Sequence, residues 1–223
     1  QLICGSARGI IDHVESQDVV TFTGSADTGK MLKSNKRIVE EAVPFNMEAD
    51  SLNSSVLAPD VEPGSPEFDL FVKEVQREMT VKCGQKCTAI RRVIVPEDRL
   101  EDVQIALANR LAKTTIGDPQ VEGVRMGSLA GKEQVEEVRG RIEELMKSSE
   151  LVYGSMDTVK AEGVGTDKGA FISPIILVNK DPFRNLSTHD VEAFGPVVTL
   201  LPYNSLDEAI QITKMGKGSL VCS

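Results

Sequence analysis

The sequence lacks any apolar run approaching the roughly 18 residues that a membrane-spanning helix requires. It also opens without the charged and apolar regions of a secretory signal. Basic residues are few, because 25 Lys and Arg stand against 34 Asp and Glu for a net charge of -9. Binding of nucleic acid through phosphate contacts needs a basic face, which this balance disfavours. These absences predict a soluble, cytoplasmic protein that binds neither membranes nor nucleic acid.

Cysteine is scarce as well, with only Cys4, Cys83, Cys87 and Cys222 in 223 residues. Four cysteines do not form the disulfide framework of a secreted domain in so long a chain. Cys83 and Cys87 are spaced C-x3-C, but there is no second pair and both histidines lie far away in the sequence, whereas structural zinc needs four ligands. We therefore predict no metal site, and leave open a redox disulfide between the pair.

The residues that are present indicate a globular α/β protein. Hydrophobic residues make up 40%, charged residues 26% and aromatic residues 4%, which fits a packed domain and not a disordered tail. Short apolar runs alternate with helical patterns, which predicts a parallel sheet covered by helices on both faces. A change near residue 51 predicts two domains, 1–51 and 52–223. Because the chain starts at Gln1 and ends in an apolar stretch, we expect a piece of a longer protein.

Local patterns place the individual elements. Ser65 suits a helix cap and Pro66 a first turn, and the apolar residues that follow at helical spacing predict a helix over 65–79. A glycine-rich segment, 154–169, is expected to form a loop or a hairpin. Further helices are predicted over 9–14, 30–33, 100–111, 132–147 and 206–215. Strands are predicted over 2–4, 19–22, 38–45, 92–96, 172–178 and 197–201.

Cys87 is a candidate nucleophile. It follows a Gly-Gln-Lys turn between a predicted helix and a predicted strand, where rigid elements commonly carry reactive groups. A free thiol has a pKa near 8.5, so an attacking cysteine needs a positive neighbour, a helix terminus or a base. Lys86, Arg91 and Arg92 are candidates for that positive field. A single cysteine is more often a small core residue, so position alone leaves both interpretations open.

A base for this thiol has two candidate sources. Glu48, at the end of an apolar run, is either a solvated strand end or a general base whose pKa is raised by a partly dry pocket, and Asp50 is its rival. His189 would instead make Cys87 a thiol hydrolase or acyltransferase, although no Asn or Asp at recognisable spacing supports a triad. By itself, Glu192 before Phe-Gly-Pro is an ordinary loop carboxylate.

A third motif could bind phosphate. Gly24 and Ser25, with Gly29 close behind, predict a strand, a tight turn and a helix start, a geometry that presents backbone N–H groups to an anion. The spacing G-x-x-x-x-G is weak evidence on its own, and the dinucleotide fingerprint G-x-G-x-x-G is absent.

In combination these landmarks resemble the aldehyde dehydrogenase superfamily. They occur in the family's order over nearly the whole chain, as residues 22–29, 48, 84–92, 116–119, 126–127, 169–174 and 192–197. The resemblance implies the end of a Rossmann-type coenzyme domain followed by most of an α/β catalytic domain. It also implies that Cys87 attacks an aldehyde and that Glu48 activates the water that hydrolyses the resulting thioester.

The resemblance further implies NADP or NAD as the cofactor. Gly24 and Ser25 would contact the pyrophosphate, while Glu192 and Phe194 would hold the nicotinamide half, with Glu192 on the ribose. In the family, an Asn from a segment upstream of Gln1 supplies a second oxyanion donor beside the Cys87 N–H. We therefore expect residues 1–223 alone to be inactive. The parent protein is expected to be a homo-oligomer, and a non-catalytic interaction fragment remains an alternative.

Residues 45–53 and 84–92 are similar to the PaaZ type of phenylacetate degradation. Its members join an aldehyde dehydrogenase domain to a C-terminal MaoC-like enoyl-CoA hydratase domain, which is absent from residues 1–223. This similarity implies a CoA-linked semialdehyde as substrate and favours NADP. It also accounts for Asp50-Ser51-Leu52, which stands where most aldehyde dehydrogenases have a Gly-Gly-Lys turn.

Overall fold

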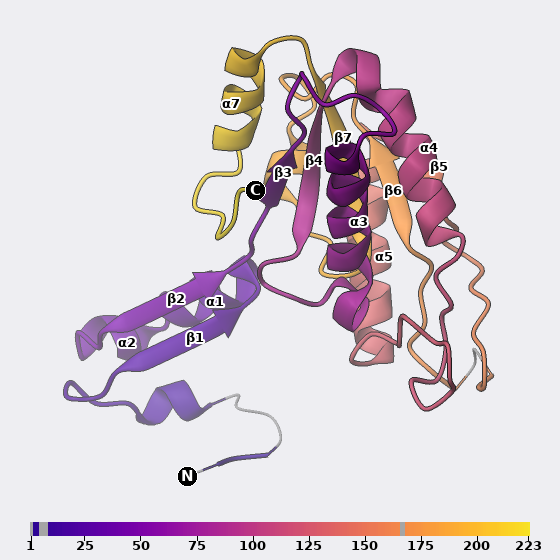
Figure 1. Ribbon diagram of the computed structural model, residues 1–223. Coiled ribbons are helices and arrows are strands. Elements are labelled where there is room, and N and C mark those ends of the chain that lie inside the picture. Colours follow the sequence, from indigo (N-terminus) through magenta and orange to yellow (C-terminus); the bar gives the residue numbers. More distant parts are fainter. Residues whose placement is uncertain (1, 5–8, 166–167) are drawn as a thin grey trace. The chain divides into compact units, whose positions relative to one another are not determined.

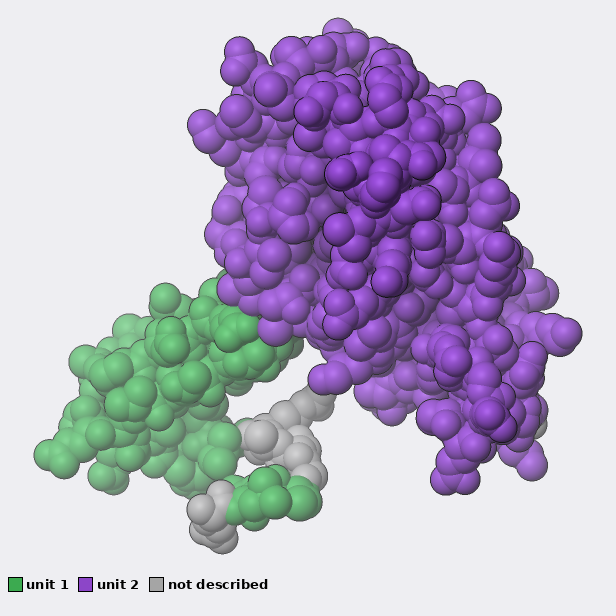
Figure 2. Space-filling view, viewed as in Figure 1, with its two compact units in different colours: residues 1–50 green, residues 51–223 purple. Residues whose placement is uncertain are grey.

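The computed structural model describes residues 2–4, 9–165 and 168–223. Contacts divide the chain into two compact units, residues 1–50 and 51–223, which Figure 2 distinguishes by colour. The identification of these units as a dinucleotide-binding part and a catalytic part stays a prediction. Within the described residues, no helix is long and apolar enough to cross a membrane.

The first unit is a small βαβ arrangement. Its elements are η1 (Ile10–His13), β1 (Val20–Gly24), α1 (Ala26–Lys33), α2 (Lys36–Glu40) and β2 (Phe45–Ala49). β1 and β2 pair in parallel, which requires the crossover that α1 and α2 supply. Buried Ile11, Ile38 and Val43 form the core of this unit.

Two predicted strands of the first unit are wrong. Residues 2–4 form no regular structure. The stretch 38–45 is divided between the end of α2, a turn and the start of β2. The turn is marked by Ala42, whose φ of 52° is left-handed and interrupts both helix and strand.

The second unit contains a five-stranded sheet in the order β3-β4-β7-β6-β5 (Figure 1). The strands are β3 (Asn53–Val56), β4 (Ile90–Pro96), β5 (Glu150–Tyr153), β6 (Ile175–Val178) and β7 (Val197–Tyr203). β3, β4, β7 and β6 run parallel, and β5 is antiparallel to β6. The predicted parallel sheet is therefore confirmed except at this edge, which the sequence analysis missed.

Helices cover both faces of this sheet. One core joins α3 (Pro66–Thr80) and α4 (Leu100–Leu111) to Val93, Val95 and Val198 of the strands. The other joins α5 (Lys132–Met146) to Ile175, Leu177 and Val197. Figure 1 shows α3 and α5 on opposite sides of the strands. The alternation of strand side chains between two buried faces explains why β6 and β7 are apolar at nearly every position.

Most predicted elements of the second unit are confirmed within a few residues. The remaining elements are η2 (Val81–Gly84), η3 (Glu97–Arg99), α6 (Ser187–Asp190) and α7 (Leu206–Lys214). Ser65 caps α3 by accepting from the Phe68 N–H at 3.2 Å, as predicted. The predicted strand over 172–178 begins only at Ile175, since Pro174 has no N–H for a ladder. The described part of 154–169 forms a loop.

Candidate active site

Cys87 lies in a loop, residues 84–89, which we call the nucleophile loop. It follows α3 through an unusual chain reversal, because Lys82, Cys83 and Gly84 have φ values of 53°, 54° and 70°. Left-handed conformations cost a non-glycine residue roughly 1 to 2 kcal/mol. Such strain tends to be retained where function requires a particular backbone path. The reversal directs the chain from the end of α3 into the loop and then into β4.

The two cysteines of the C-x3-C spacing have opposite environments. Cys83 is fully buried, whereas Cys87 is exposed, and both are free thiols. Burial raises the pKa of Cys83 to about 12, which keeps that thiol protonated and unreactive. Within the described residues, no group of His, Cys, Asp and Glu could hold a metal ion. Only the second cysteine of the pair is therefore placed to react.

Native alkylation should separate these two thiols. Iodoacetamide at mildly alkaline pH is expected to modify Cys87, together with exposed Cys4 and Cys222, and to spare Cys83, which is buried and protonated. Trypsin cleaves after Lys82 and Lys86, so the two cysteines fall on different peptides and mass spectrometry reads them separately. Equal modification of Cys83 and Cys87 in the folded protein would contradict this geometry.

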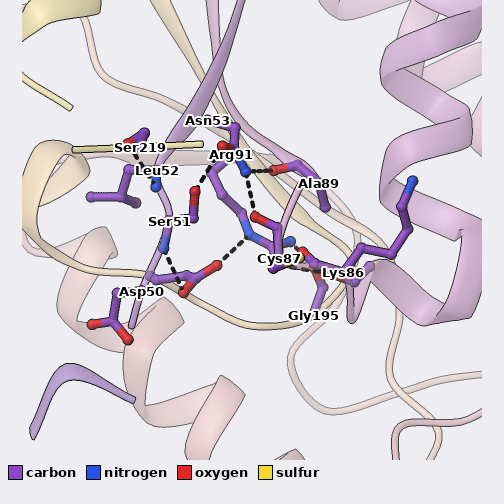
Figure 3. A network of polar contacts seen from close by, with 12 residues as sticks. Asp50, Ser51, Leu52, Asn53, Lys86, Cys87, Ala89, Arg91, Gly195 and Ser219 are labelled. Carbon is purple, nitrogen blue, oxygen red and sulfur yellow. Dashed lines mark hydrogen bonds and ion pairs between the residues drawn. The ribbon is translucent and has the colours of Figure 1, made fainter. Parts of the chain in front are cut away.

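Asn53 holds the nucleophile loop from β3. Its amide donates to the Cys87 carbonyl at 2.8 Å and to the Ala89 carbonyl at 2.9 Å (Figure 3). Its oxygen accepts from the Ser51 hydroxyl at 2.7 Å and from the Val221 N–H at 2.8 Å. Asn53 is fully buried, so these four bonds saturate the side chain. The amide thereby fixes the backbone on the C-terminal side of the thiol.

Arg91 holds the other end of the loop. Its Nη2 donates to the Gly84 carbonyl at 2.8 Å and to the Lys86 carbonyl at 3.4 Å. Its Nη1 donates to the Gly195 carbonyl at 2.8 Å. Burial lowers the pKa of Arg91, and the nearby charge of Glu192 offsets part of that effect. The guanidinium thus joins the loop to the segment before β7.

That segment carries Glu192 and Phe194. The Glu192 carboxylate is buried and contacts Arg91 Nε at 3.2 Å. It also accepts from the Ser51 N–H at 3.1 Å. The Arg91 guanidinium lies over the Phe194 ring, 5.3 Å from its centroid. Both predicted coenzyme residues of this segment are thus brought beside the nucleophile loop. Glu192 does lie in a loop, and its carboxylate is a buried ion-pair partner of Arg91.

The three cations proposed as neighbours of the thiol all have other partners. Lys86 forms an ion pair with both oxygens of Glu78, each at 2.7 Å. Arg91 pairs with Glu192. Arg92 donates to the Leu52 carbonyl at 2.7 Å and also to α7 carbonyls, and burial lowers its pKa to about 10. The sequence could not separate these roles, since all three lie within five positions of Cys87.

His189 is not available to Cys87. It is buried, with Nε2 at 2.9 Å from the Pro182 carbonyl and Nδ1 at 3.2 Å from Arg92. A carbonyl only accepts, so Nε2 carries the proton and Nδ1 accepts from the guanidinium. Burial and, to a smaller extent, the Arg92 charge lower the pKa of His189, while the Pro182 bond opposes them. Both ring nitrogens are engaged, which removes the base of the predicted thiol hydrolase or acyltransferase.

The first unit carries the other predicted site residues. Gly24 ends β1 and Ser25 caps α1, with its hydroxyl accepting from the Thr28 N–H at 3.3 Å. Glu48 lies in β2 with an exposed side chain, so the first unit does not itself supply the partly dry pocket. The role of Glu48 as a base stays a prediction.

The start of α1 is where the pyrophosphate contact is predicted. Backbone N–H groups and the helix dipole favour an anion at this position. Asp50 supplies such an anion within the chain itself, because its carboxylate accepts from the Ala26 N–H at 3.0 Å. Asp50 has a φ of 39°, a left-handed conformation that glycine adopts more readily than aspartate. The contact of Gly24 and Ser25 with a pyrophosphate stays a prediction.

Fold and loop together define a class, the α/β proteins of aldehyde dehydrogenase type. An aldehyde dehydrogenase from Bacillus cereus has a similar structure, with a TM-score of 0.76 and 25% identity over 94% of this chain and 39% of that one. Aldehyde dehydrogenase C from Pseudomonas syringae, solved as a variant in complex with NAD+ and octanal, gives a TM-score of 0.73 and 25% identity over 89% and 38%.

Comparison of the sequence with known families and proteins leads to the same class. The model of the aldehyde dehydrogenase family matches residues 1–223, and the chain therefore belongs to that family. The 3,4-dehydroadipyl-CoA semialdehyde dehydrogenase of Aromatoleum evansii is 43% identical over 222 residues, 100% of this chain and 43% of that protein. This chain thus spans less than half the length of the curated relatives it matches. The predicted family is confirmed, whereas closeness to the PaaZ type stays a prediction.

Proposed function

We propose that the protein containing these residues oxidises a CoA-linked semialdehyde to a carboxylic acid, with NADP or NAD as hydride acceptor. The observation that carries this proposal is the nucleophile loop. Its carbonyls at Gly84, Lys86, Cys87 and Ala89 all accept hydrogen bonds, while the Cys87 N–H donates to no acceptor in the described part of the chain. An exposed thiol beside a free N–H suits attack on a carbonyl whose oxygen becomes negative.

In this proposal the Cys87 thiolate attacks the aldehyde carbon and forms a C–S bond, and the carbonyl electrons move to oxygen. The Cys87 N–H donates to that oxyanion, and one such donor is worth roughly 3 kcal/mol. The bound nicotinamide supplies the acceptor for the hydride that leaves this carbon, and a thioester on Cys87 results. Glu48 then takes a proton from water, which adds to the thioester and releases the carboxylic acid and the thiolate.

Four residues make the coenzyme contacts in this proposal. Gly24 and Ser25 would hold the pyrophosphate, and Glu192 and Phe194 the nicotinamide half. Support for the substrate class comes from the 43% identical relative, which is named a CoA semialdehyde dehydrogenase. A homo-oligomeric parent, a role in phenylacetate degradation and a hydratase domain outside residues 1–223 belong to the same proposal through the PaaZ resemblance.

Trapping of the thioester tests this function. Assays use the longest natural chain that contains these residues, with a CoA-linked semialdehyde and with NADP+ or NAD+. Glu48→Gln is expected to lower steady-state turnover at least about 100-fold. It should still give one burst of reduced coenzyme, because hydride transfer precedes hydrolysis. Mass spectrometry should then find an acyl group on the peptide that begins with Cys87.

Asp50→Asn is the matched control, since it also converts a carboxylate into its amide and Asp50 is the rival base. It should give no accumulated thioester. If the thioester accumulates with Asp50→Asn and not with Glu48→Gln, Asp50 is the base. If the unaltered enzyme forms no reduced coenzyme from any aldehyde, the proposed function is wrong.

A further inference from the structure

Arg91 lies where two distant segments of the second unit meet. One segment is the nucleophile loop, and the other is residues 192–195, more than 100 positions later, where Glu192 contacts Arg91 across 101 residues of sequence. Figure 3 shows Arg91 in one network with Cys87, Lys86 and Gly195. One guanidinium therefore bonds to both the loop of the proposed nucleophile and the segment of the proposed coenzyme contacts.

We propose that Arg91 is a positioning residue that couples coenzyme contact at Glu192 to the nucleophile loop. The proposal rests on the proposed function and deepens it, because it names Arg91 as the residue through which contact at Glu192 reaches the loop that carries Cys87.

The first argument is burial. The Arg91 side chain is 4% exposed and the Glu192 side chain 7% exposed. A buried charge is tolerated only when it is paired and its N–H groups are hydrogen-bonded. Arg91 meets this condition only while both segments are in place, because each supplies part of its acceptors. Displacement of either segment leaves a buried cation with unmet donors, so the two segments are expected to move as one.

The second argument is the shape of the guanidinium. Its donors are fixed in one plane, so Nη1, Nη2 and Nε cannot be reoriented independently. A shift of Glu192 therefore turns the group that holds the Gly84 and Lys86 carbonyls. Lysine has a single rotatable ammonium on a flexible stem and would keep the charge without this rigid link. Arg91→Lys thus removes the coupling specifically.

Arg92 provides a matched control on the same strand. It is also buried, but its guanidinium donates to His189 Nδ1 and to the Leu52, Ile212 and Thr213 carbonyls, and to neither segment joined by Arg91. Arg92→Lys makes the same chemical change in a comparable environment. A general loss of packing would affect both variants, whereas a loss of coupling would affect only Arg91→Lys.

The test measures the rate at which iodoacetamide alkylates Cys87, with and without saturating NADP+ or NAD+, in the longest natural chain containing these residues. For the unaltered protein and for Arg92→Lys, coenzyme is expected to change the rate at least about fivefold. For Arg91→Lys the change should be less than about twofold. A full response in Arg91→Lys, or none in the unaltered protein, would overturn the proposal.

Hydrogen exchange of the coenzyme-free protein separates this proposal from the proposed function. Arg91→Lys should speed amide exchange in residues 84–89 and 192–197 together, and Arg92→Lys should not. Faster exchange in one segment only, or in neither, counts against the coupling even if aldehyde oxidation is found. If exchange speeds up in both segments but the unaltered protein oxidises no aldehyde, only the proposed function is rejected. If Arg91→Lys does not fold, Glu192→Gln breaks the same ion pair with little change of volume.

Discussion

Replacing Cys87 by alanine is expected to abolish aldehyde-dependent reduction of the coenzyme, with a loss in kcat of at least about 10⁴-fold. The loss is large because, in the proposed function, the thiol would form the covalent bond on which both later steps depend. Because the side chain is exposed, the free energy of unfolding should stay within about 0.5 kcal/mol of the unaltered protein. Absorbance of the reduced coenzyme and a denaturant titration measure the two effects.

Cys83→Ala is the matched control, only four positions earlier. Its thiol is fully buried, so the smaller side chain leaves a cavity that should cost about 1 to 2 kcal/mol of stability. Activity per folded molecule should be retained, since a buried thiol with a pKa of about 12 takes no part in attack. If Cys83→Ala lost turnover and Cys87→Ala kept it, the nucleophile would be Cys83 and not Cys87.

Much of the fold could be predicted because its signals are local. The Ser65-Pro66 pair and the helical spacing after it set the start of α3, and buried strands such as β7 are apolar at nearly every position. β3 gave no such signal, since Asn53, Ser54 and Ser55 are polar and nevertheless buried. Their burial depends on partners from distant loops, which a local pattern does not contain.

The residues of the candidate site likewise include some that local patterns predict and others that they do not. The position of Cys87 in a loop between helix and strand follows from local patterns, and so does the helix-capping turn at Ser25. The sequence analysis missed Asn53 altogether, and it considered Arg91 only as a charge near the thiol. Both bind groups far along the chain, with Asn53 34 positions from Cys87 and Arg91 104 positions from Gly195. Such contacts depend on the register of the sheet and cannot be derived from spacing.

The second large effect is expected for Gly84→Ala. Gly84 has a φ of 70°, and a Cβ there would lie 2.1 Å from the Gly195 carbonyl oxygen. The left-handed φ by itself should destabilise the variant by roughly 1 to 2 kcal/mol. Because the Cβ also clashes with backbone atoms, the total loss in free energy of unfolding should reach about 3 to 5 kcal/mol. The clash should also separate the nucleophile loop from residues 192–195 by about 1 Å, which should lower kcat about 100-fold per folded molecule. Chemical denaturation and coenzyme reduction measure both.

Gly64→Ala isolates the contribution of the contact. Gly64 also has a left-handed φ, of 82°, but a Cβ there would meet no atom within 4 Å. This variant should lower the free energy of unfolding by only about 1 kcal/mol and should leave turnover unchanged, because its backbone is strained but its new Cβ meets no other atom. The difference between the two variants therefore measures the close approach of the Gly84 and Gly195 backbones. Equal stability of the two would mean that the nucleophile loop does not pack against the Glu192 segment, which would remove the basis for the coupling through Arg91.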